Sequence, residues 1–276
     1  MIELKDIHKS FGKKHVLQGV SFTIPKGEIT ALIGVNGVGK TTLLKHIMQL
    51  APVDKGTILI DGKKPTPQLY EKVSFIPDAS IMLSQYTIRN AMDFMATYYD
   101  CWNEKRAQEI LKSFRLREQD RIADLSKGNV AKVNMLFGFA LDTDYILMDE
   151  PFSGVDIFTR EEINKIFSSY LIKDRGVLIT THEINEIEQI VDRVVVIEEG
   201  QIITEFHVEA MREEQGKSIV DVLREIHSRG DHLAVFDERL VDPEIEEPFP
   251  FHNHFYDTEN SAGNNHRNSH QKGDDE

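Results

Sequence analysis

The segment from Gly34 to Thr42 constrains the fold of this chain more than any other, because glycines and a lysine follow directly after the apolar run 28–33. Glycines let the backbone turn without Cβ clashes, so that successive N–H groups converge on phosphate oxygens. A helix that begins near Lys40 adds the positive end of its dipole. The segment therefore predicts a strand, a phosphate-binding loop and a helix in that order.

The loop is expected to bind the phosphates of a nucleotide. Lys40 is expected to reach the β- and γ-phosphates, and the Thr41 hydroxyl to bind Mg²⁺. A loop without a ligand is the alternative, which the agreement of strand, glycine spacing and helix disfavours. The apolar positions that give the helix its buried face are Leu43, Leu44, Ile47 and Met48. The residues predicted to bind the nucleotide are Gly34, Val35, Asn36, Gly37, Val38, Gly39, Lys40, Thr41 and Thr42.

A second apolar run, 145–148, ends in two adjacent acids, Asp149 and Glu150. Its pattern is typical of a buried parallel strand. The chain turns at the carboxyl end of such a strand, so Asp149 is expected to face Mg²⁺ while Glu150 faces the attacking water. The alternative is a pair of acids on a solvated loop. Together with the phosphate loop, the two acids indicate phosphoryl transfer.

Three further segments point to a family: Leu125-Ser-Lys-Gly-Asn129, Ser153-Gly-Val-Asp156, and the apolar run 177–181 followed by His182. In order and character, the motifs resemble the ATP-binding subunit of an ABC transporter. The resemblance extends from about Ile2 to Ile203. It implies a P-loop NTPase fold with a mostly parallel sheet, an antiparallel edge β subdomain and an inserted helical subdomain.

The resemblance also implies roles for residues outside the phosphate loop. Ser126 and Gly128 would contact the γ-phosphate of ATP held by the second cassette of a head-to-tail dimer, and Asp156 would couple the two sites. His182 would contact the γ-phosphate, and Phe11 would stack on adenine. The alternatives are that Phe11 is a core residue, that Asp156 is an exposed turn residue and that His182 has a structural role.

Three positions in two motifs depart from the usual family pattern. Asp78 stands where the family normally has a glutamine that touches Mg²⁺ or water and leads toward the membrane partner. A carboxylate can ligate Mg²⁺, yet it also repels the γ-phosphate, so the role is retained, altered or lost. In the signature pentapeptide, Lys127 and Asn129 replace the commonest residues. Asp78 resembles the acidic residue of some bacterial exporters, and export is therefore preferred over import.

The chain is expected to divide into three parts. Residues 1–204 would form the ABC ATPase domain, with the helical subdomain at about 86–141. Residues 205–240 would form an appendage with a short helix, for which Ser218 and Asp221 resemble a capping box. Residues 241–276, rich in acids, histidine and asparagine, are predicted to be disordered, because little apolar surface offsets the entropy of ordering.

Composition agrees with a cytoplasmic enzyme. The 276 residues contain one cysteine, Cys101, and no apolar stretch long enough to span a bilayer or act as an N-terminal signal. A formal net charge of −14 disfavours binding to nucleic acids or anionic lipids. We therefore expect contact with the membrane through a protein partner, at its cytoplasmic face.

The leading interpretation is an ATPase that uses ATP and Mg²⁺ to energise transport by a membrane permease on a separate chain. ATP-driven dimerisation, as a homodimer or heterodimer, would complete two active sites. Two alternatives remain at this point: a soluble ABC-type ATPase that acts as a remodelling or interaction module, and a regulatory subunit of low turnover. Relatives of the first kind have long coiled coils or duplicated cassettes, and neither is seen in this chain.

Overall fold

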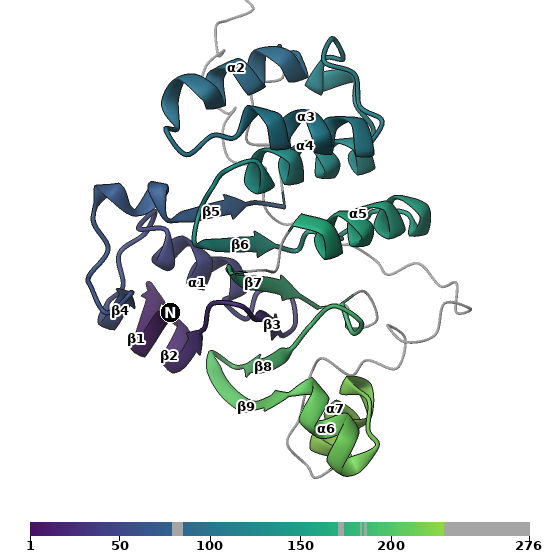
Figure 1. Ribbon diagram of the computed structural model, residues 1–276. Coiled ribbons are helices and arrows are strands. Elements are labelled where there is room, and N and C mark those ends of the chain that lie inside the picture. The colour runs from purple at the N-terminus through teal and green to yellow at the C-terminus, as the bar shows by residue number, and fades with distance from the viewer. Residues whose placement is uncertain (79–84, 171–173, 183, 185–186, 229–276) are drawn as a thin grey trace, which may run out of the picture.

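A mostly parallel six-stranded sheet forms the centre of the computed structural model, which describes residues 1–78, 85–170, 174–182, 184 and 187–228. Its strand order is β5-β6-β7-β3-β8-β9, and only the β8–β9 pair is antiparallel (Figure 1). The strands are β3 (Ile29–Ile33), β5 (Val73–Ile76), β6 (Tyr145–Asp149), β7 (Gly176–Thr181), β8 (Arg193–Glu198) and β9 (Gln201–His207). The strands predicted before the loop and before the two acids are therefore confirmed.

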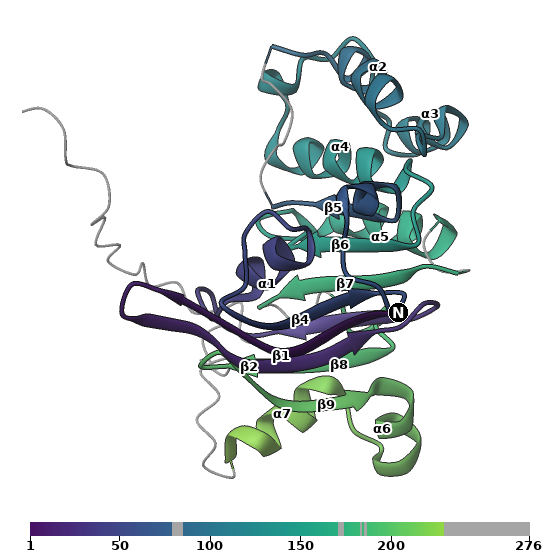
Figure 2. The same cartoon turned by 90° about the vertical axis from the view of Figure 1, so that its left-hand side faces the viewer.

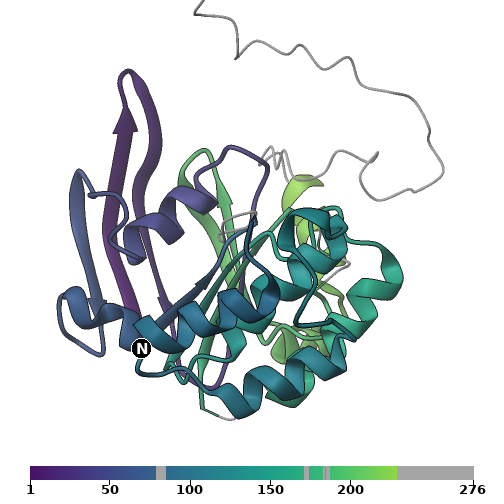
Figure 3. The same ribbon diagram turned by 90° about the horizontal axis from the view of Figure 1, so that it is seen from above.

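A separate three-stranded antiparallel sheet lies beside it, in the order β2-β1-β4 (Figure 2). Its strands are β1 (Ile2–Phe11), β2 (Lys14–Ile24) and β4 (Lys55–Ile60). The β1–β2 hairpin extends to the periphery of the molecule, as the view from above shows (Figure 3). This sheet is the antiparallel β subdomain that the sequence predicted.

Alternation along the central strands divides the core in two. In β3, Ile29, Ala31 and Ile33 face one core, whereas Leu32 faces the other. The first core lies under helices α2 to α5, and the second lies between the two sheets and around α1. Both faces of the parallel sheet are thus covered, which explains why β3, β6 and β7 are buried along their whole length.

Helices cover the sheet at both ends of the molecule. Helices α2, α3 and α4 lie at one end and α6 and α7 at the other (Figures 1 and 2). The helices are α1 (Lys40–Ile47), α2 (Ile88–Tyr98), α3 (Glu104–Ser113), α4 (Lys127–Phe139), α5 (Ile157–Tyr170), α6 (Val208–Gln215) and α7 (Ile219–Ser228), with 3₁₀ turns at η1 (Pro67–Glu71) and η2 (Ile122–Asp124).

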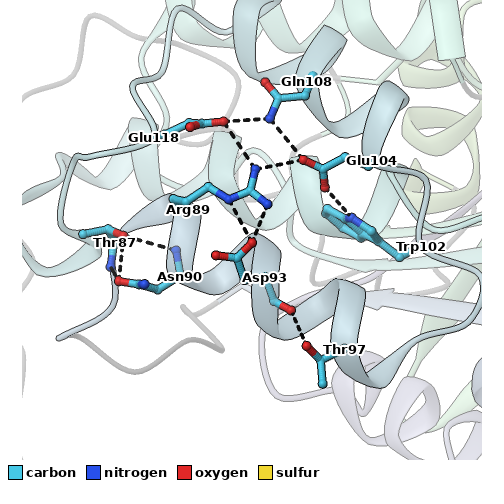
Figure 4. Close-up of polar contacts among 9 residues, drawn as sticks. All are labelled: Thr87, Arg89, Asn90, Asp93, Thr97, Trp102, Glu104, Gln108 and Glu118. Carbon is cyan, nitrogen blue, oxygen red and sulfur yellow. Dashed lines mark hydrogen bonds and ion pairs between the residues drawn. The ribbon is translucent and has the colours of Figure 1, made fainter.

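Helices α2 and α3 are joined by a polar network around Arg89 (Figure 4). The guanidinium pairs with Asp93 on its own helix and donates to Glu104 Oε1 at 2.8 Å. Trp102 Nε1 donates to the other oxygen of Glu104 at 2.9 Å. Hydrogen bonds to Asp93 and Glu104 raise the pKa of Arg89, so its guanidinium stays charged. The network thus joins α2 to the first turn of α3.

The C-terminal part differs from expectation in two places. The apolar positions Ile184, Ile187, Ile190 and Val191 predict an amphipathic helix after His182. This prediction is wrong for residues 187–190, which form a turn with i→i+3 hydrogen bonds. Its isoleucines are β-branched, which lowers helix propensity, and Ile187 is fully buried against the core. Helix α6 was not predicted. The predicted helix α7 is present with its Ser218–Asp221 capping box, and its buried Leu223 packs on the first core. Residues 229–276, including the tail, lie outside the described residues.

Substitution of Phe167 measures how much packing in the first core stabilises the fold. Its ring lies 5.4 Å from that of Phe139 and 5.7 Å from that of Phe152, and it is fully buried. We expect Phe167→Ala to lower the free energy of unfolding by about 3–5 kcal/mol, because it leaves a cavity between α4 and α5. The control is Phe158→Ala on the same helix, which is 80% exposed and should cost under about 0.5 kcal/mol. Urea denaturation measures both, and equal losses would contradict this account of the core.

Candidate functional site

A cleft of about 480 Å³ opens at the carboxyl ends of the parallel strands β3, β6 and β7. Ligands of open α/β sheets bind at this edge, because the loops that leave parallel strands meet there. The residues that line the cleft are Phe11, Lys14, Val16, Asn36, Gly37, Gly39, Lys40, Thr41, Thr42, Asp78, Asp149, Glu150, Ser153 and His182. The sheet thus gathers residues from separate parts of the sequence into one site.

The loop between β3 and α1 needs glycine at two positions for different reasons. Gly39, which precedes α1, has φ 116°, and a Cβ there would lie 2.9 Å from Leu17 Cδ2. A Cβ at Gly34 would lie 2.5 Å from the carbonyl oxygen of Ile197. The loop therefore packs closely against β2 and β8, and of its nine predicted residues Gly34, Val35 and Val38 support the cleft without lining it.

Lys40 places a buried positive charge at the floor of the cleft. Its side chain is 4% exposed, and Nζ donates to the carbonyl oxygens of Gly34 at 2.5 Å and Val35 at 3.3 Å. Nζ also lies 2.9 Å from Glu150 Oε1. The ammonium is held at the N-terminus of α1, where the helix dipole also favours an anion.

Two side chains with oxygen atoms, those of Thr41 and Asp149, meet beside Lys40. Thr41 Oγ1 donates to Asp149 Oδ1 at 3.0 Å, although 108 positions separate the two residues. Thr180 Oγ1 donates to the same carboxylate oxygen at 2.8 Å, because the β6–β7 register places Asp149 opposite Thr180. A buried carboxylate and a hydroxyl are the donors that a hard divalent cation takes. Thr41 and Asp149 could therefore hold Mg²⁺, as the sequence predicted.

Glu150 reaches the same cleft through an unusual backbone conformation. Consecutive strand residues point to opposite faces, but Glu150 has φ 46°, and its side chain faces the cleft together with Asp149. Its N–H donates to Thr180 O at 3.1 Å, which holds this turn. A left-handed conformation outside glycine is costly and is found mostly where function requires it.

His182 is the partner of Glu150. Its Nδ1 lies 2.6 Å from Glu150 Oε2, so Lys40 and His182 contact the two oxygens of one carboxylate. These three side chains come from α1, from the end of β6 and from the end of β7. The arrangement can hold a carboxylate in one orientation while leaving a second donor, the imidazole, near the same point in the cleft.

Phe11 lies at the end of β1, 56% exposed, and lines the cleft together with Lys14 and Val16 from β2. Such exposure is unusual for a phenylalanine. The ring is thus available to a ligand, and the alternative that Phe11 is a core residue is wrong.

Ser126, Gly128 and Asp156 are not among the residues that line the cleft. Ser126 caps α4 by accepting a hydrogen bond from Asn129 N at 3.3 Å, and Asp156 accepts one from Thr159 N at 3.0 Å. A Cβ at Gly128 would lie 3.3 Å from Thr159, so the starts of α4 and α5 pack together. The structure therefore groups these three residues in a second place, beside the cleft.

Sequence reasoning missed three lining residues and one supporting residue. Lys14, Val16 and Ser153 line the cleft, and Thr180 binds Asp149. Thr180 could have been recognised from the sequence, because a hydroxyl near the carboxyl end of a buried apolar strand needs a hydrogen-bond partner. Whether Lys14 and Val16 line the cleft depends on how the β1–β2 hairpin packs against the phosphate loop, and no local sequence pattern shows this packing.

Residues 17–153 match a family model described as "ABC transporter". The chain is 31% identical over 217 residues to the "ABC transporter ATP-binding protein YtrB" of Bacillus subtilis (strain 168), covering 78% of this chain and 74% of that protein. This chain belongs to the ABC transporter ATP-binding proteins. Members of this family bind ATP and hydrolyse it to drive transport, together with membrane permease subunits.

Two further similarities support the assignment of this ABC transporter subunit. It is 31% identical to the "Petrobactin import ATP-binding protein YclP" of Bacillus subtilis (strain 168), over 87% of this chain and 98% of that protein. A solved "Structure of ATP binding subunit of ABC transporter" superimposes with a TM-score of 0.71 at 28% identity, covering 82% of this chain and 99% of that one. The predicted fold class is therefore confirmed. Among the described residues, no helix is long and apolar enough to cross a membrane.

Proposed function

We propose that this ABC subunit binds ATP with Mg²⁺ in the cleft and hydrolyses it within a dimer of two cassettes, and that this powers transport by a permease on a separate chain. The single observation that supports the proposal most is the convergence of Lys40, Asp149, Glu150 and His182 at one end of the sheet. These residues supply a cation for phosphate, a cation ligand, a base and a donor, which are the parts that phosphoryl transfer needs.

The phosphates are bound by the loop and by Lys40. Residues 39–42, at the N-terminus of α1, line the cleft, and the helix dipole favours an anion there. The Lys40 ammonium is 4% exposed, so its charge acts on the β- and γ-phosphates through little intervening water. These contacts neutralise charge on the γ-phosphoryl group and keep it in line for attack.

The residues present fit a magnesium ion. Thr41 and Asp149 offer adjacent oxygens at the mouth of the cleft, and Mg²⁺ takes one or two protein oxygens together with phosphates and water. When bound, the ion would neutralise charge on the phosphate oxygens. Asp78 lines the same cleft and is a third candidate ligand.

Glu150 is the residue that orients and polarises the attacking water. Its carboxylate is fixed by Lys40 at 2.9 Å and by His182 at 2.6 Å. Once Lys40 contacts phosphate, the carboxylate is available to accept a proton from water. His182 then contacts the γ-phosphate from the end of β7. The reaction needs no covalent intermediate.

The active site is completed by the partner cassette. Ser126 and Gly128 lie at the N-terminus of α4, outside the cleft of their own chain, where the helix end favours an anion brought by another chain. Asp156 lies beside them and would couple the two sites. A homodimer would contain two such sites.

A mixing experiment tests this composite site. We expect Ser126→Arg and Lys40→Ala chains to be inactive alone, because each dimer then has two defective sites. An equal mixture should recover about a quarter of the wild-type rate, because half of the dimers are mixed and each has one intact site of two. A mixture of Ser126→Arg with wild type is the control for subunit exchange. Full activity of Ser126→Arg alone would contradict the proposal.

Phe11 is proposed to stack on the adenine ring. Base stacking on an aromatic side chain contributes about 1–3 kcal/mol, so Phe11→Ala should weaken ATP binding about 10- to 100-fold. Phe11→Tyr keeps the ring and should bind normally. Inorganic triphosphate, which has no base, should bind both variants as it binds the wild type. Calorimetric titration measures all of these affinities, and an equal loss for triphosphate would contradict stacking.

Export remains the proposed direction, and it depends on Asp78 alone, since the similarity extends to a protein named for import. A second candidate function, a regulatory subunit of low turnover, draws support from Asp78 and the altered signature. The ordered Lys40–Glu150–His182 contacts favour hydrolysis instead. Co-purification with a hydrophobic protein supports the permease partner, and Mg²⁺-dependent turnover of that complex excludes the regulatory function. We propose that the subunit binds peripherally at the cytoplasmic face of the membrane.

A further inference from the structure

We propose that Lys127 compensates the charge of Asp78 within one chain, and that it thereby allows a carboxylate to stand beside the γ-phosphate. The inference rests on the nucleotide site proposed above. Lys127 is the second residue of the segment Ser126–Asn129, and Asp78 follows β5. Lys127 would then be a positioning residue for the cleft of its own chain, in addition to any contact that α4 makes with a partner cassette.

A small cavity connects the two residues. It has a volume of about 30 Å³ and lies between β5, the start of α4 and the turn after β6. Asp78, Lys127, Glu150 and Ser153 all line it, and Asp78, Glu150 and Ser153 also line the nucleotide cleft. A volume of this size has room for one or two water molecules. The cavity therefore links Lys127 to the cleft through Asp78.

The position of Lys127 is set by the turn after β6. A Cβ at Gly154 would lie 2.3 Å from Lys127 Nζ and 3.0 Å from its Cε, so the lysine stem lies directly over this glycine. Gly154 has φ 65°, a conformation that disfavours other residues. Lys127 is exposed, yet its ammonium is thereby held over the turn that follows Glu150.

The charges around Asp78 explain why a compensating cation is needed. Partial burial raises the pKa of this carboxyl group, and the negative charges of Asp149 and Glu150 act in the same direction. The positive charge of Lys127 opposes them and has a larger effect than the charge of any other single residue. The γ-phosphate of bound ATP would add more negative charge at this point. Without Lys127, Asp78 would repel it.

The experiment compares ATP with ADP, because only ATP brings the γ-phosphate near Asp78. Calorimetric titrations with Mg²⁺ use the full chain at a concentration at which light scattering shows a monomer. Lys127→Gln should weaken ATP binding about tenfold and ADP binding less than about twofold. Lys127→Arg should bind both normally. The matched control is Lys105→Gln, which removes one positive charge from the exposed surface of α3 and should change neither affinity.

The double variant distinguishes compensation of Asp78 by Lys127 from a direct contact between Lys127 and phosphate. Asp78→Asn removes the carboxylate, so adding Lys127→Gln to it should leave ATP affinity within about twofold of Asp78→Asn alone. A loss of the same size in both backgrounds would overturn the pair, as would equal weakening of ATP and ADP. Failure of the wild-type chain to bind ATP would instead overturn the proposed function, and the pair with it.

Discussion

Glu150→Gln is expected to lower ATP turnover about a thousandfold while leaving ATP affinity nearly unchanged. A positioned general base contributes about 10²–10⁴ to rate, and an amide cannot accept the proton of the attacking water. Binding should persist because the phosphates are held by the loop and Lys40, which the substitution leaves in place. Loss of the carboxylate also removes a negative charge that competes with phosphate for Lys40 at 2.9 Å.

The same variant should accumulate as an ATP-bound dimer, because closure needs binding and reopening needs hydrolysis. Light scattering with and without ATP measures the dimer, and phosphate release measures turnover. Glu161→Gln, an exposed glutamate on α5, is the matched control and should behave as wild type. Turnover of Glu150→Gln within tenfold of wild type would contradict the role of this carboxylate.

Lys40→Ala is expected to weaken ATP binding at least about thirtyfold, since losing one partner of a buried charge contact costs about 2–5 kcal/mol. The ammonium is 4% exposed and is the positive charge that the phosphate loop itself supplies to the cleft. The matched control is Lys45→Ala on the same helix, where the lysine is exposed. Both variants keep α1, because alanine is a good helix former.

Thermal unfolding gives a second measurement of this loss. Wild-type protein should be stabilised by ATP by about 2.7 kcal/mol at a nucleotide concentration a hundredfold above Kd, and Lys45→Ala equally. Lys40→Ala should be stabilised by less than about 1 kcal/mol at that concentration. If it were stabilised as strongly as wild type, the loop would bind phosphate without its lysine, and the proposed site would be wrong.

Much of the fold and site could be predicted because the decisive signals are local. The apolar strands before Gly34 and after Tyr145, with the glycines and acids at their ends, indicate parallel strands whose carboxyl ends meet. The two strands lie on either side of β7 in the sheet, and their carboxyl ends bring Thr41 and Asp149 into contact. The alternation that assigns Leu32 to one core and its neighbours to the other is equally local.

The rest depends on tertiary packing. The left-handed turn at Glu150 is stabilised by Thr180 on another strand, and nothing in the neighbouring sequence requires it. The apolar spacing at 187–190 also fits a helix, and it is the burial of Ile187 against the core that favours a turn there. Lys127 could be recognised as an unusual residue, but its approach to Asp78 depends on the turn at Gly154.

The most direct test of the central claim is turnover per chain as a function of protein concentration, with the dimer fraction followed by light scattering. A site completed by a second cassette predicts that turnover per chain rises with concentration and parallels the ATP-bound dimer fraction. Constant turnover per chain down to concentrations at which only monomer is present would contradict the composite site.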